Sequence, residues 1–575
     1  MTAFRVWAPA AGRVELAAAG QLREMTAGPG GWWSATAAEA GADVRYAFRL
    51  DGGDLLADPR SPRQPDGPGG LSQRYDHAGF SWTDGSWRGR PLRGGVIYEL
   101  HVGTFTAAGT FDAAIERLDY LVSLGIDFVE LMPVASFPGS RGWGYDGISL
   151  WSVHEPYGGP DGLKRFVDAC HQRGLAVLLD VVYNHVGIGN RLADFGPYFT
   201  ERHLTPWGPA VNFDQPGSDE VRAFVIGSAL MWLRDYHADG LRLDAVHAIE
   251  DHRAIHVLEE LAGQVSSLAG ELGRELVLIA ESDANDPRLV SPPPAGYGIS
   301  AQWSDDFHHA VHAAVTGERQ GYYCDFGSLA ALARTLTRVF YHDGTWSRFR
   351  GRSHGRPVPA GLGADRFIGF LQDHDQVGNR AAGDRIGART PLALVKVAAG
   401  LVLTAPFTPM LFMGEEWGAS TPWQYFTDHP DPRLGRAVSD GRQAEFAAHG
   451  WQPGQIPDPQ EPATFERSGL DWSQAAAPQH RDLLAWYREL IALRHSRPEL
   501  TEPSLDQVRV AYDESARWLV VRRGRLRIVV SLGRVPQRVE IGAAGGLVLA
   551  ASKPGVSVAG GSCSMPPESL AVVLA

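Results

Sequence analysis

The alternation of apolar and polar residues divides the chain into three parts. Residues 1–90 carry short alternating runs, such as 44–50, separated by Gly and Pro, a pattern typical of a small β-sandwich. Short alternating runs return near the C-terminus, for example at 518–522 and 526–530. The pattern therefore predicts an N-terminal β-sandwich over residues 1–90 and a C-terminal β-domain over residues 498–575.

Between these parts, over residues 91–497, strand-like apolar runs alternate with helix-like runs. The runs with the length and composition of buried strands are 96–100, 126–133, 176–182, 240–244, 276–281, 299–303, 367–371 and 410–413. Strands that alternate with helices in this way predict the α/β class and a (β/α)8 TIM barrel. The long irregular stretch near 184–217 is predicted to be a short insertion that protrudes from the barrel.

Two of the predicted helices show a clear period of 3.6 residues. The first follows Thr110, a candidate N-cap, and stops at Gly125. The second stops before Gly174. The residues expected on their buried faces are Phe111, Ile115, Leu118 and Val122 in the first helix, and Leu163, Phe166, Val167 and Cys170 in the second.

Carboxylates stand at the ends of the predicted barrel strands. Asp244 and Glu281 end the fourth and fifth strands, and Asp375 lies just after the seventh. Because active sites of such barrels form at the C-terminal ends of the strands, we expect these side chains to share one site. Arg242 lies on the same side of its strand as Asp244, where its charge would keep the carboxylate ionised.

Paired carboxylates that flank a bond are the machinery of glycoside hydrolysis. One carboxylate attacks the anomeric carbon, and the other protonates the leaving oxygen. Glu281 follows a strongly apolar run, so burial could raise its pKa and keep it protonated. The alternative interpretation is that Arg242 and Asp244 form only a buried ion pair and that Glu281 caps a helix.

The amino-acid composition makes some classes of binding partner less plausible than others. The net charge of −13 argues against nucleic acid or an anionic membrane as partners, and no apolar run is long enough to suggest a membrane span. Cys170, Cys324 and Cys563 are too few and too far apart to suggest a disulfide framework or a metal knuckle, so a reducing cytoplasm is expected. The 17 Trp residues point mildly toward sugar stacking, although core packing accounts for any single one.

Four ordered segments identify a family. Residues 180–185, 240–247, 279–282 and 371–379 resemble the four motifs of the α-amylase family of glycosidases. The resemblance implies that Asp244 is the nucleophile, that Glu281 is the general acid/base, and that Asp375 stabilises the transition state. The family retains the anomeric configuration, which implies that the two working carboxyl groups lie roughly 5 Å apart.

The resemblance also implies a set of substrate-binding residues. Tyr145 would stack beneath the sugar in the cleaved position, His185 and His374 would hydrogen-bond to it, and Asp180 would hold Arg242. A loop tyrosine such as Tyr145 can equally be a packing residue. The full expected set is Tyr145, His185, Arg242, His247, Asp305, Asp306, His308, His309, His374, Gln376, Asn379 and Arg380.

Longer blocks point to one substrate within the family. They lie at 98–105, 205–214, 303–309, 375–380 and 413–418. They resemble blocks of members that cleave the α-1,4 bond next to the terminal trehalose unit of maltooligosyltrehalose. In that case the residues that line the trehalose end are Asp305, Asp306, His308, His309, Gln376, Asn379 and Arg380. The alternative for His308 and His309 is that they merely begin a helix.

Two other functions remain open at this stage. One is a glycogen debranching or branching enzyme of the same family, and the other is a glucan-binding protein with an inactive barrel. Amylases of the family often bind calcium, and Asn184 occupies a position that can be a ligand, but no acidic cluster accompanies it in 184–217. We therefore expect no metal and no cofactor, with maltooligosyltrehalose and glucan oligosaccharides as ligands. Trp32 and Trp33 could touch long glucans, although core packing is the favoured interpretation.

Overall fold

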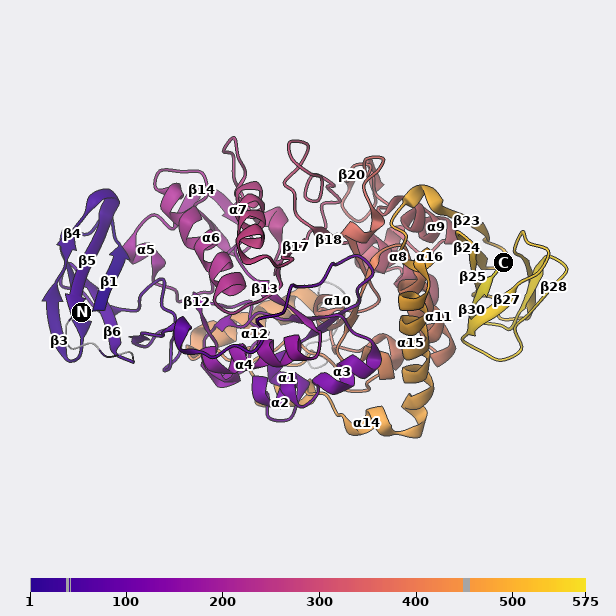
Figure 1. Ribbon diagram of the computed structural model, residues 1–575, viewed down its shortest axis with the longest axis horizontal. Helices are drawn as coiled ribbons and strands as arrows, with labels where there is room; N and C mark the ends of the chain where they lie inside the picture. The colour runs from indigo at the N-terminus through magenta and orange to yellow at the C-terminus, as the bar shows by residue number, and fades with distance from the viewer. Residues whose placement is uncertain (1, 38–40, 42, 448–455) are drawn as a thin grey trace.

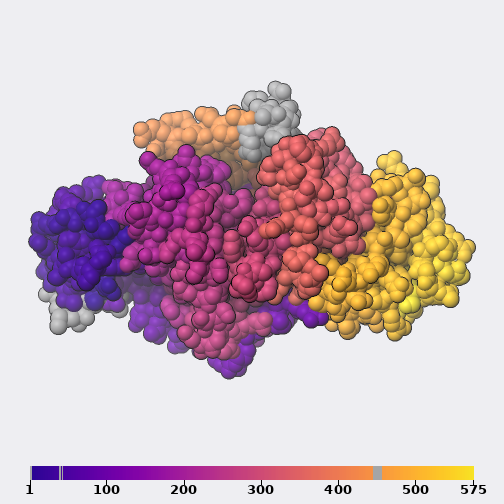
Figure 2. Space-filling view, turned by 90° about the horizontal axis from the view of Figure 1, so that it is seen from above, coloured from indigo at the N-terminus to yellow at the C-terminus, as the bar shows by residue number. Residues whose placement is uncertain are grey.

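The computed structural model describes residues 2–37, 41, 43–447 and 456–575, which form three bodies in a row. The N-terminal sheets lie at one end, the barrel lies in the middle and the C-terminal sheets lie at the other end (Figures 1 and 2). Within the described residues, no helix combines the length and the apolar composition that crossing a membrane requires.

The N-terminal part consists of two antiparallel sheets, as the alternation predicts. Their inner faces bury Val14, Leu16 and Phe48, each 0% exposed. One sheet has the order β1 (Thr2–Trp7), β5 (Trp32–Ala37), β4 (Thr26–Ala27). The other has the order β3 (Gln21–Glu24), β2 (Val14–Ala18), β6 (Arg45–Leu50), β7 (Leu55–Leu56), with β8 (Ser72–Gln73) also paired to β6.

Trp32 joins these sheets to the barrel. Its Nε1 donates to Glu220 Oε1 at 3.0 Å, and the guanidinium of Arg60 lies 5.0 Å from its ring centroid. Glu220 belongs to a barrel helix, α6 (Ser218–Arg234). Trp33 donates to the carbonyl of Ala8 within the N-terminal sheets. Both tryptophans therefore have structural partners.

All eight predicted barrel strands are present, and they close into one parallel barrel. Each strand is buried along its whole length, which is why its sequence is a continuous apolar run rather than an alternating one. The order around the barrel is β9 (Ile97–Leu100), β10 (Phe128–Leu131), β13 (Ala176–Val181), β16 (Gly240–Leu243), β17 (Val277–Ala280), β18 (Ala301–Trp303), β21 (Phe367–Phe370) and β22 (Thr408–Phe412).

Helices cover the outside of the barrel and fill its connections. The longer ones besides α6 are α4 (Gly159–Gln172), α7 (Val257–Leu272), α8 (Asp305–Thr316), α9 (Leu329–Arg338), α11 (Leu392–Thr404), α12 (Pro432–Ala447) and α15 (Pro478–Ser496). The shorter ones are α1 (Val102–Phe105), α5 (Leu192–Phe195), α10 (His374–Gly378), α13 (Pro462–Arg467), α14 (Ser473–Ala476) and α16 (Pro498–Thr501).

The helix predicted after Thr110 is in fact two helices. Thr110 caps α2 (Phe111–Ile115), and a break at residues 116–117 separates it from α3 (Leu118–Leu124), which Gly125 ends with a φ of 94°. The buried face of α3 consists of Leu118, Leu121 and Leu124, so Val122 lies off it and is 43% exposed, and Ile115 of α2 is only half-buried. The expected face was therefore wrong at these two positions. The second predicted helix, α4, buries all four expected residues.

Three short hairpins complete the barrel region. β11 (Ala135–Ser136) pairs with β12 (Ser149–Val153), and β19 (Thr345–Ser347) pairs with β20 (Arg352–His354). The predicted insertion holds α5 and the hairpin of β14 (Phe199–Thr205) and β15 (Gly208–Val211).

The C-terminal part packs against α11. A Cβ on Gly400 of this helix would come within 2.7 Å of Leu570, so the glycine permits the close approach. One antiparallel sheet has the order β23 (Val508–Asp513), β24 (Trp518–Arg523), β25 (Leu526–Ser531), β30 (Ser569–Leu574), β27 (Leu547–Ala551). The other has the order β26 (Gln537–Glu540), β29 (Ser562–Met565), β28 (Ser557–Ala559).

Candidate active site

Asp244 and Glu281 lie next to each other because their strands are neighbours. β16 and β17 pair in parallel, with Leu243 opposite Ala280, so the residue after each strand emerges at the same edge of the barrel. The N–H of Ala245 donates to Glu281 Oε2 at 2.6 Å, which ties the turn after Asp244 to the second carboxylate. Ala245 takes a left-handed conformation (φ 39°), an uncommon one for a residue with a Cβ.

Arg242 is the common partner of three carboxylates. Its Nη1 donates to Asp244 Oδ1 at 2.7 Å and to Asp180 at 2.9 and 3.0 Å, and its Nη2 lies 3.7 Å from Glu281 Oε2. The guanidinium is fully buried and lies 4.4 Å from the ring centroid of Trp303. A buried cation held in this way favours the ionised form of its carboxylate neighbours.

Asn184 holds the other side of Asp244. Its Nδ2 donates to Asp244 Oδ2 and to the Asp244 carbonyl, both at 2.7 Å. With Arg242 at Oδ1, each carboxylate oxygen of Asp244 has its own donor. The position of the carboxylate is therefore fixed from two sides.

Burial raises the pKa of Glu281 above its ordinary value. Arg242 opposes this shift, Asp244 adds to it, and His247 opposes it more weakly. The side chain of Glu281 is 14% exposed, so solvent screens it only partly. The environment thus favours a protonated Glu281 beside Asp244, which suits an acid and a nucleophile.

A relay of hydrogen bonds connects Glu99 to Asp180 through His374 and Tyr145. Glu99 faces His374 Nδ1 at 2.5 Å, His374 Nε2 lies 2.8 Å from the Tyr145 hydroxyl, and Tyr145 donates to Asp180 Oδ2 at 2.6 Å. Burial by itself lowers the pKa of His374, but Glu99 and Asp375 outweigh it and raise the pKa to about 10. His374 is therefore cationic at neutral pH and links Glu99 to the groups that hold Arg242.

Asp375 is the most exposed of the three candidate catalytic carboxylates. Its side chain is 43% exposed, against 11% for Asp244. His374 Nε2 lies 3.7 Å from Asp375 Oδ1, and Asn379 Nδ2 donates to the same oxygen at 3.3 Å. The carboxylate is thus oriented by neighbours but left open to a ligand.

His185 packs against the hairpin of the insertion. Its Nε2 lies 3.0 Å from the Tyr145 carbonyl, and its ring stacks on Trp207 with centroids 4.5 Å apart and planes at 10°. Trp207 lies at the turn between β14 and β15 and is 48% exposed. The hairpin therefore brings an exposed aromatic face next to a candidate sugar-binding histidine.

The candidates at the start of α8 divide into two kinds. Asp305 is half-buried, and its pKa is raised by burial first and then by the neighbouring carboxyl group of Glu281. Asp306 is 2% exposed and accepts from Asn285 Nδ2 and from the N–H groups of residues 341 and 342. Asp305 therefore borders Glu281, whereas Asp306 holds loops together.

His308 and His309 lie inside an aromatic wall. The ring of His308 stacks on Phe370, and its Nε2 lies 3.1 Å from the Tyr323 hydroxyl. His309 stacks on Tyr322 with centroids 4.6 Å apart. Burial lowers the pKa of both rings, to about 3 for His309, so both are neutral.

The candidate residues after β21 also have hydrogen-bond partners within the protein. The side-chain amide of Gln376 donates to Asp373, which caps α10. Arg380 forms a paired contact with Glu318 at 2.9 and 3.0 Å. Asn379, which is exposed, is the most accessible residue of this group.

Sequence analysis missed Glu99 and Glu130. Both are buried one residue before the end of an apolar strand, and they face each other across the β9–β10 pair. The sequence did contain a signal for them, namely a single acidic residue inside an apolar strand. A buried carboxyl group must either have a partner or be neutral, so such a residue is a candidate for a functional role. Glu99 finds that partner in His374, and burial raises the pKa of Glu130 far above its ordinary value.

Asn184 does not fit the calcium role that the family implies for its position. Its amide nitrogen holds Asp244, and its oxygen lies 2.5 Å from His185 Nδ1. The side chain is used on both sides to fix catalytic candidates. Calcium needs six to eight oxygen ligands, and Asn184 offers no free oxygen to such a set.

Comparison with known proteins gives consistent matches. The model of the family described as "Alpha amylase, catalytic domain" matches residues 78–194, and a domain of unknown function (DUF3459) matches residues 503–572. Malto-oligosyltrehalose trehalohydrolases from Mycobacterium tuberculosis and Arthrobacter ramosus are 55% and 56% identical, over 96% and 95% of each chain. A crystal structure from Salmonella typhimurium, of a protein provisionally described as an alpha amylase, is 38% identical with a TM-score of 0.91 over 100% of this chain and 97% of the other.

Proposed function

The chain belongs to the malto-oligosyltrehalose trehalohydrolases of the α-amylase family, and on this premise we propose that it hydrolyses maltooligosyltrehalose. The bond cleaved is the α-1,4-glucosidic bond next to the terminal trehalose unit. The products are trehalose and a shortened maltooligosaccharide. The ligands are α-glucan oligosaccharides, and the three free cysteines are consistent with a cytoplasmic location.

In the first step Asp244 attacks the anomeric carbon of the glucosyl unit, while Glu281 gives its proton to the glycosidic oxygen. The bond from that carbon to the oxygen breaks, and trehalose leaves with the proton. Asp244 becomes a covalent glycosyl ester. Arg242 and Asn184 hold the two oxygens of Asp244, so the attacking group is already oriented.

In the second step the ionised Glu281 takes a proton from water. The resulting nucleophile attacks the same carbon, and the ester bond to Asp244 breaks. Two inversions give net retention, so the new reducing end is an α-anomer. Glu281 ends the cycle protonated, as burial beside Asp244 favours.

Asp375 stabilises the sugar as positive charge develops on its ring, and the neighbouring His374 donates a hydrogen bond to a sugar hydroxyl. Tyr145, which lies against His374, stacks beneath the same ring, and His185 hydrogen-bonds to it. Asp305, His247 and Asn379 are the accessible groups on the trehalose side. Their proximity to Glu281 and Asp375 supports this assignment.

The remaining candidates act as positioning residues. Asp306 holds the loop at residues 341–342, His308 and His309 build the aromatic wall, and Arg380 is paired with Glu318. Gln376 supports the cap of α10. We propose that they shape the trehalose end without direct hydrolytic roles.

A single observation carries this proposal. Asp244 and Glu281 end adjacent strands and lie against the same buried guanidinium, that of Arg242. A nucleophile and an acid in retaining glycosidases need such proximity.

The chain divides into three domains where the kind of secondary structure changes. We propose a sandwich over residues 1–90 of the immunoglobulin-like, carbohydrate-binding type, a catalytic barrel over 91–497 and a C-terminal domain over 498–575. Support comes from the strands around each boundary, because β8 (Ser72–Gln73) precedes the first boundary, β9 (Ile97–Leu100) follows it, and β23 (Val508–Asp513) follows the second.

Product analysis tests the function. The purified chain is incubated separately with maltotriosyltrehalose, amylose and glycogen, and the sugars are separated. Rapid release of trehalose with little action on the plain glucans is the expected result. Shortened or rebranched glucans without trehalose would instead assign the chain to debranching or branching, and the Asp244→Asn variant serves as the inactive control.

A further inference from the structure

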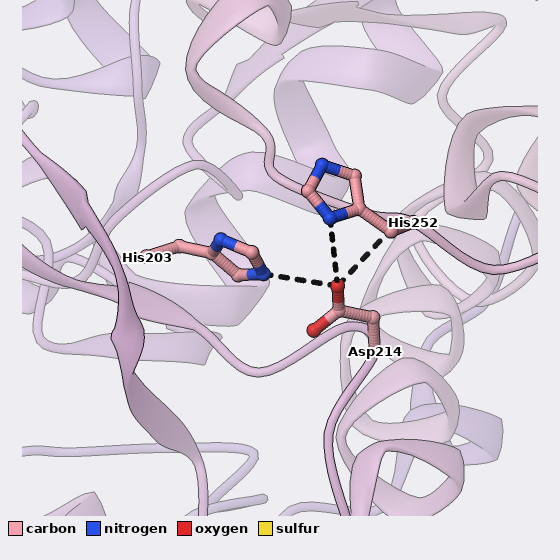
Figure 3. A group of neighbouring side chains, drawn as sticks. All are labelled: His203, Asp214 and His252. Carbon is pink, nitrogen blue, oxygen red and sulfur yellow. Dashed lines mark hydrogen bonds and ion pairs between the residues drawn. The ribbon is translucent and has the colours of Figure 1, made fainter.

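Three side chains from distant parts of the sequence meet beside the active-site insertion. His203 lies on β14, Asp214 follows β15, and His252 lies in the loop after the 3-10 turn Val246–Ala248. Both imidazoles point at one carboxylate oxygen (Figure 3). The cluster therefore joins the insertion hairpin to the loop that leaves Asp244.

The distances within the cluster suit a metal ion. His203 Nε2 lies 3.0 Å and His252 Nδ1 lies 3.7 Å from Asp214 Oδ2, and one ligand atom of each residue lies within 4.8 Å of the others. Zinc binds nitrogen and oxygen ligands at about 2.0 to 2.2 Å, so two ligands of a tetrahedral ion lie about 3.4 Å apart. To reach that geometry the ligand atoms that are farthest apart must approach each other by up to about 1.4 Å, and His203 Nε2 must move slightly away from Asp214 Oδ2.

The neighbours of the cluster orient its ligands. Gln215 Nε2 donates to Asp214 Oδ1 at 2.6 Å, which leaves Oδ2 to face the imidazoles. The second ring nitrogen of His252, Nε2, lies 3.8 Å from Glu250 Oε2. A carboxylate that hydrogen-bonds to a ligating histidine fixes the tautomer of the metal-bound imidazole, and Glu250 would have to move closer than 3.8 Å to make that bond.

The three side chains differ in exposure, and the most exposed of them leaves the cluster accessible to solvent. The side chains of Asp214 and His203 are 3% and 10% exposed, whereas that of His252 is 65% exposed. Two sheltered ligands and one exposed ligand leave the cluster open on one side to a cation from solvent.

We propose that His203, Asp214 and His252 bind one divalent transition-metal ion of the zinc type. Two imidazoles and one carboxylate form a donor set that suits zinc, whereas calcium and magnesium prefer oxygen ligands alone. Water completes the coordination on the exposed side of His252. This site is structural and takes no part in the transfer of the glycosyl group.

The ion would fasten the hairpin that carries Trp207. Trp207 stacks on His185, and the loop that holds His252 begins just after Asp244. A metal that links the two would restrict the movement of the insertion relative to the nucleophile. The inference does not depend on which glucan the enzyme cleaves.

Metal titration of the full-length chain tests the site. The protein is treated with a chelator, dialysed and titrated calorimetrically with zinc chloride, with calcium chloride in parallel. We expect saturable binding of one zinc ion per chain and no comparable binding of calcium. His252→Ala and His203→Gln should each weaken zinc binding at least tenfold, because each removes one of three ligands.

His495→Ala is the matched control. This histidine also pairs with a carboxylate, Asp127, at 2.9 Å, but within the part of the chain that the structure describes it belongs to no group of three potential metal ligands. Its variant should bind zinc as the wild type does. Cobalt provides an independent readout, because a tetrahedral site with nitrogen ligands gives visible absorption bands that His252→Ala should remove.

Two results would overturn the proposal. One is the absence of saturable zinc binding to the wild type at neutral pH. The other is equal zinc affinity in the wild type and His252→Ala. Because His252 is exposed, circular dichroism of this variant should match the wild type, which keeps loss of binding distinct from loss of fold.

Discussion

Arg242 determines how the two working carboxylates differ. It donates a short hydrogen bond to Asp244, the proposed nucleophile, but only approaches Glu281, so its charge acts more strongly on Asp244. Burial and the charge of Asp244 then raise the pKa of Glu281. In the proposed mechanism these different surroundings give two acids with similar sequence contexts opposite roles.

The Glu281→Gln variant tests the proposed role of Glu281 as the general acid. The variant keeps the shape of the side chain but has no proton to give, so kcat on maltotriosyltrehalose should fall about 10²- to 10⁴-fold. Substrate binding, measured by calorimetry, should change little. Undiminished hydrolysis by Glu281→Gln would refute the assignment.

The same residue predicts a pH dependence. The first step needs protonated Glu281, and its raised pKa keeps the proton in place above the ordinary value of 4.5. Activity (kcat/KM) should therefore decline on the alkaline side as this group ionises. With α-maltosyl fluoride, whose leaving group needs no proton, that decline should disappear, and an unchanged decline would assign it to another group.

Sequence predicts the catalytic trio but not the relay that supports it. Asp244, Glu281 and Asp375 follow apolar strands, and their positions can be inferred from local pattern alone. Glu99 and His374 are 275 residues apart and meet only because the barrel closes. Hydrogen-bond partners of this kind depend on register around the barrel, which local pattern does not contain.

At the scale of elements, β16 depends on a glycine at its start. A Cβ on Gly240 would come within 2.4 Å of the Val277 carbonyl oxygen and 2.8 Å of Leu178 Cδ2. The strand pairs with both neighbours at this residue. A larger side chain would displace the strand that carries Arg242 and leads to Asp244.

Gly240→Ala should therefore lower the stability by about 1 to 3 kcal/mol and reduce kcat as well. Thermal unfolding and steady-state kinetics measure both effects. Gly263→Ala is the control, because nothing lies within 4 Å of its Cβ position on α7. That variant should be up to about 1 kcal/mol more stable, with wild-type activity. Equal behaviour of the two variants would contradict the packing argument.

Elements themselves were predictable to different degrees. The barrel strands are buried on both faces, so each leaves a continuous apolar run that the sequence shows directly. The break between α2 and α3 was not predictable, because helical periodicity continues across residues 116–117. Only the structure shows that α3 buries Leu118, Leu121 and Leu124 and leaves Val122 exposed.

At the scale of the whole molecule, one hydrophobic core runs through all three bodies. It includes Phe48 in the N-terminal sheets, Leu131 in the barrel and Leu570 in the C-terminal sheets. Leu570 is 0% exposed and packs against α11 at Gly400. Such continuity predicts that the bodies unfold together.

Leu570→Ala should lower the stability of the barrel and the C-terminal sheets together, by about 2 to 5 kcal/mol. Scanning calorimetry should show one transition in the wild type and one at lower temperature in the variant. Leu547→Ala, at a position 64% exposed, should change little. A separate early transition in Leu570→Ala, with the main transition unmoved, would show that the C-terminal sheets unfold independently.

The most direct test of the central claim is a proton NMR time course of maltotriosyltrehalose hydrolysis. It records in one experiment which sugar leaves and with which configuration the new reducing end appears. The account predicts free trehalose together with maltotriose that is first α and only later equilibrates to the β-anomer. β-Maltotriose as the first product, or glucan products without trehalose, would contradict it.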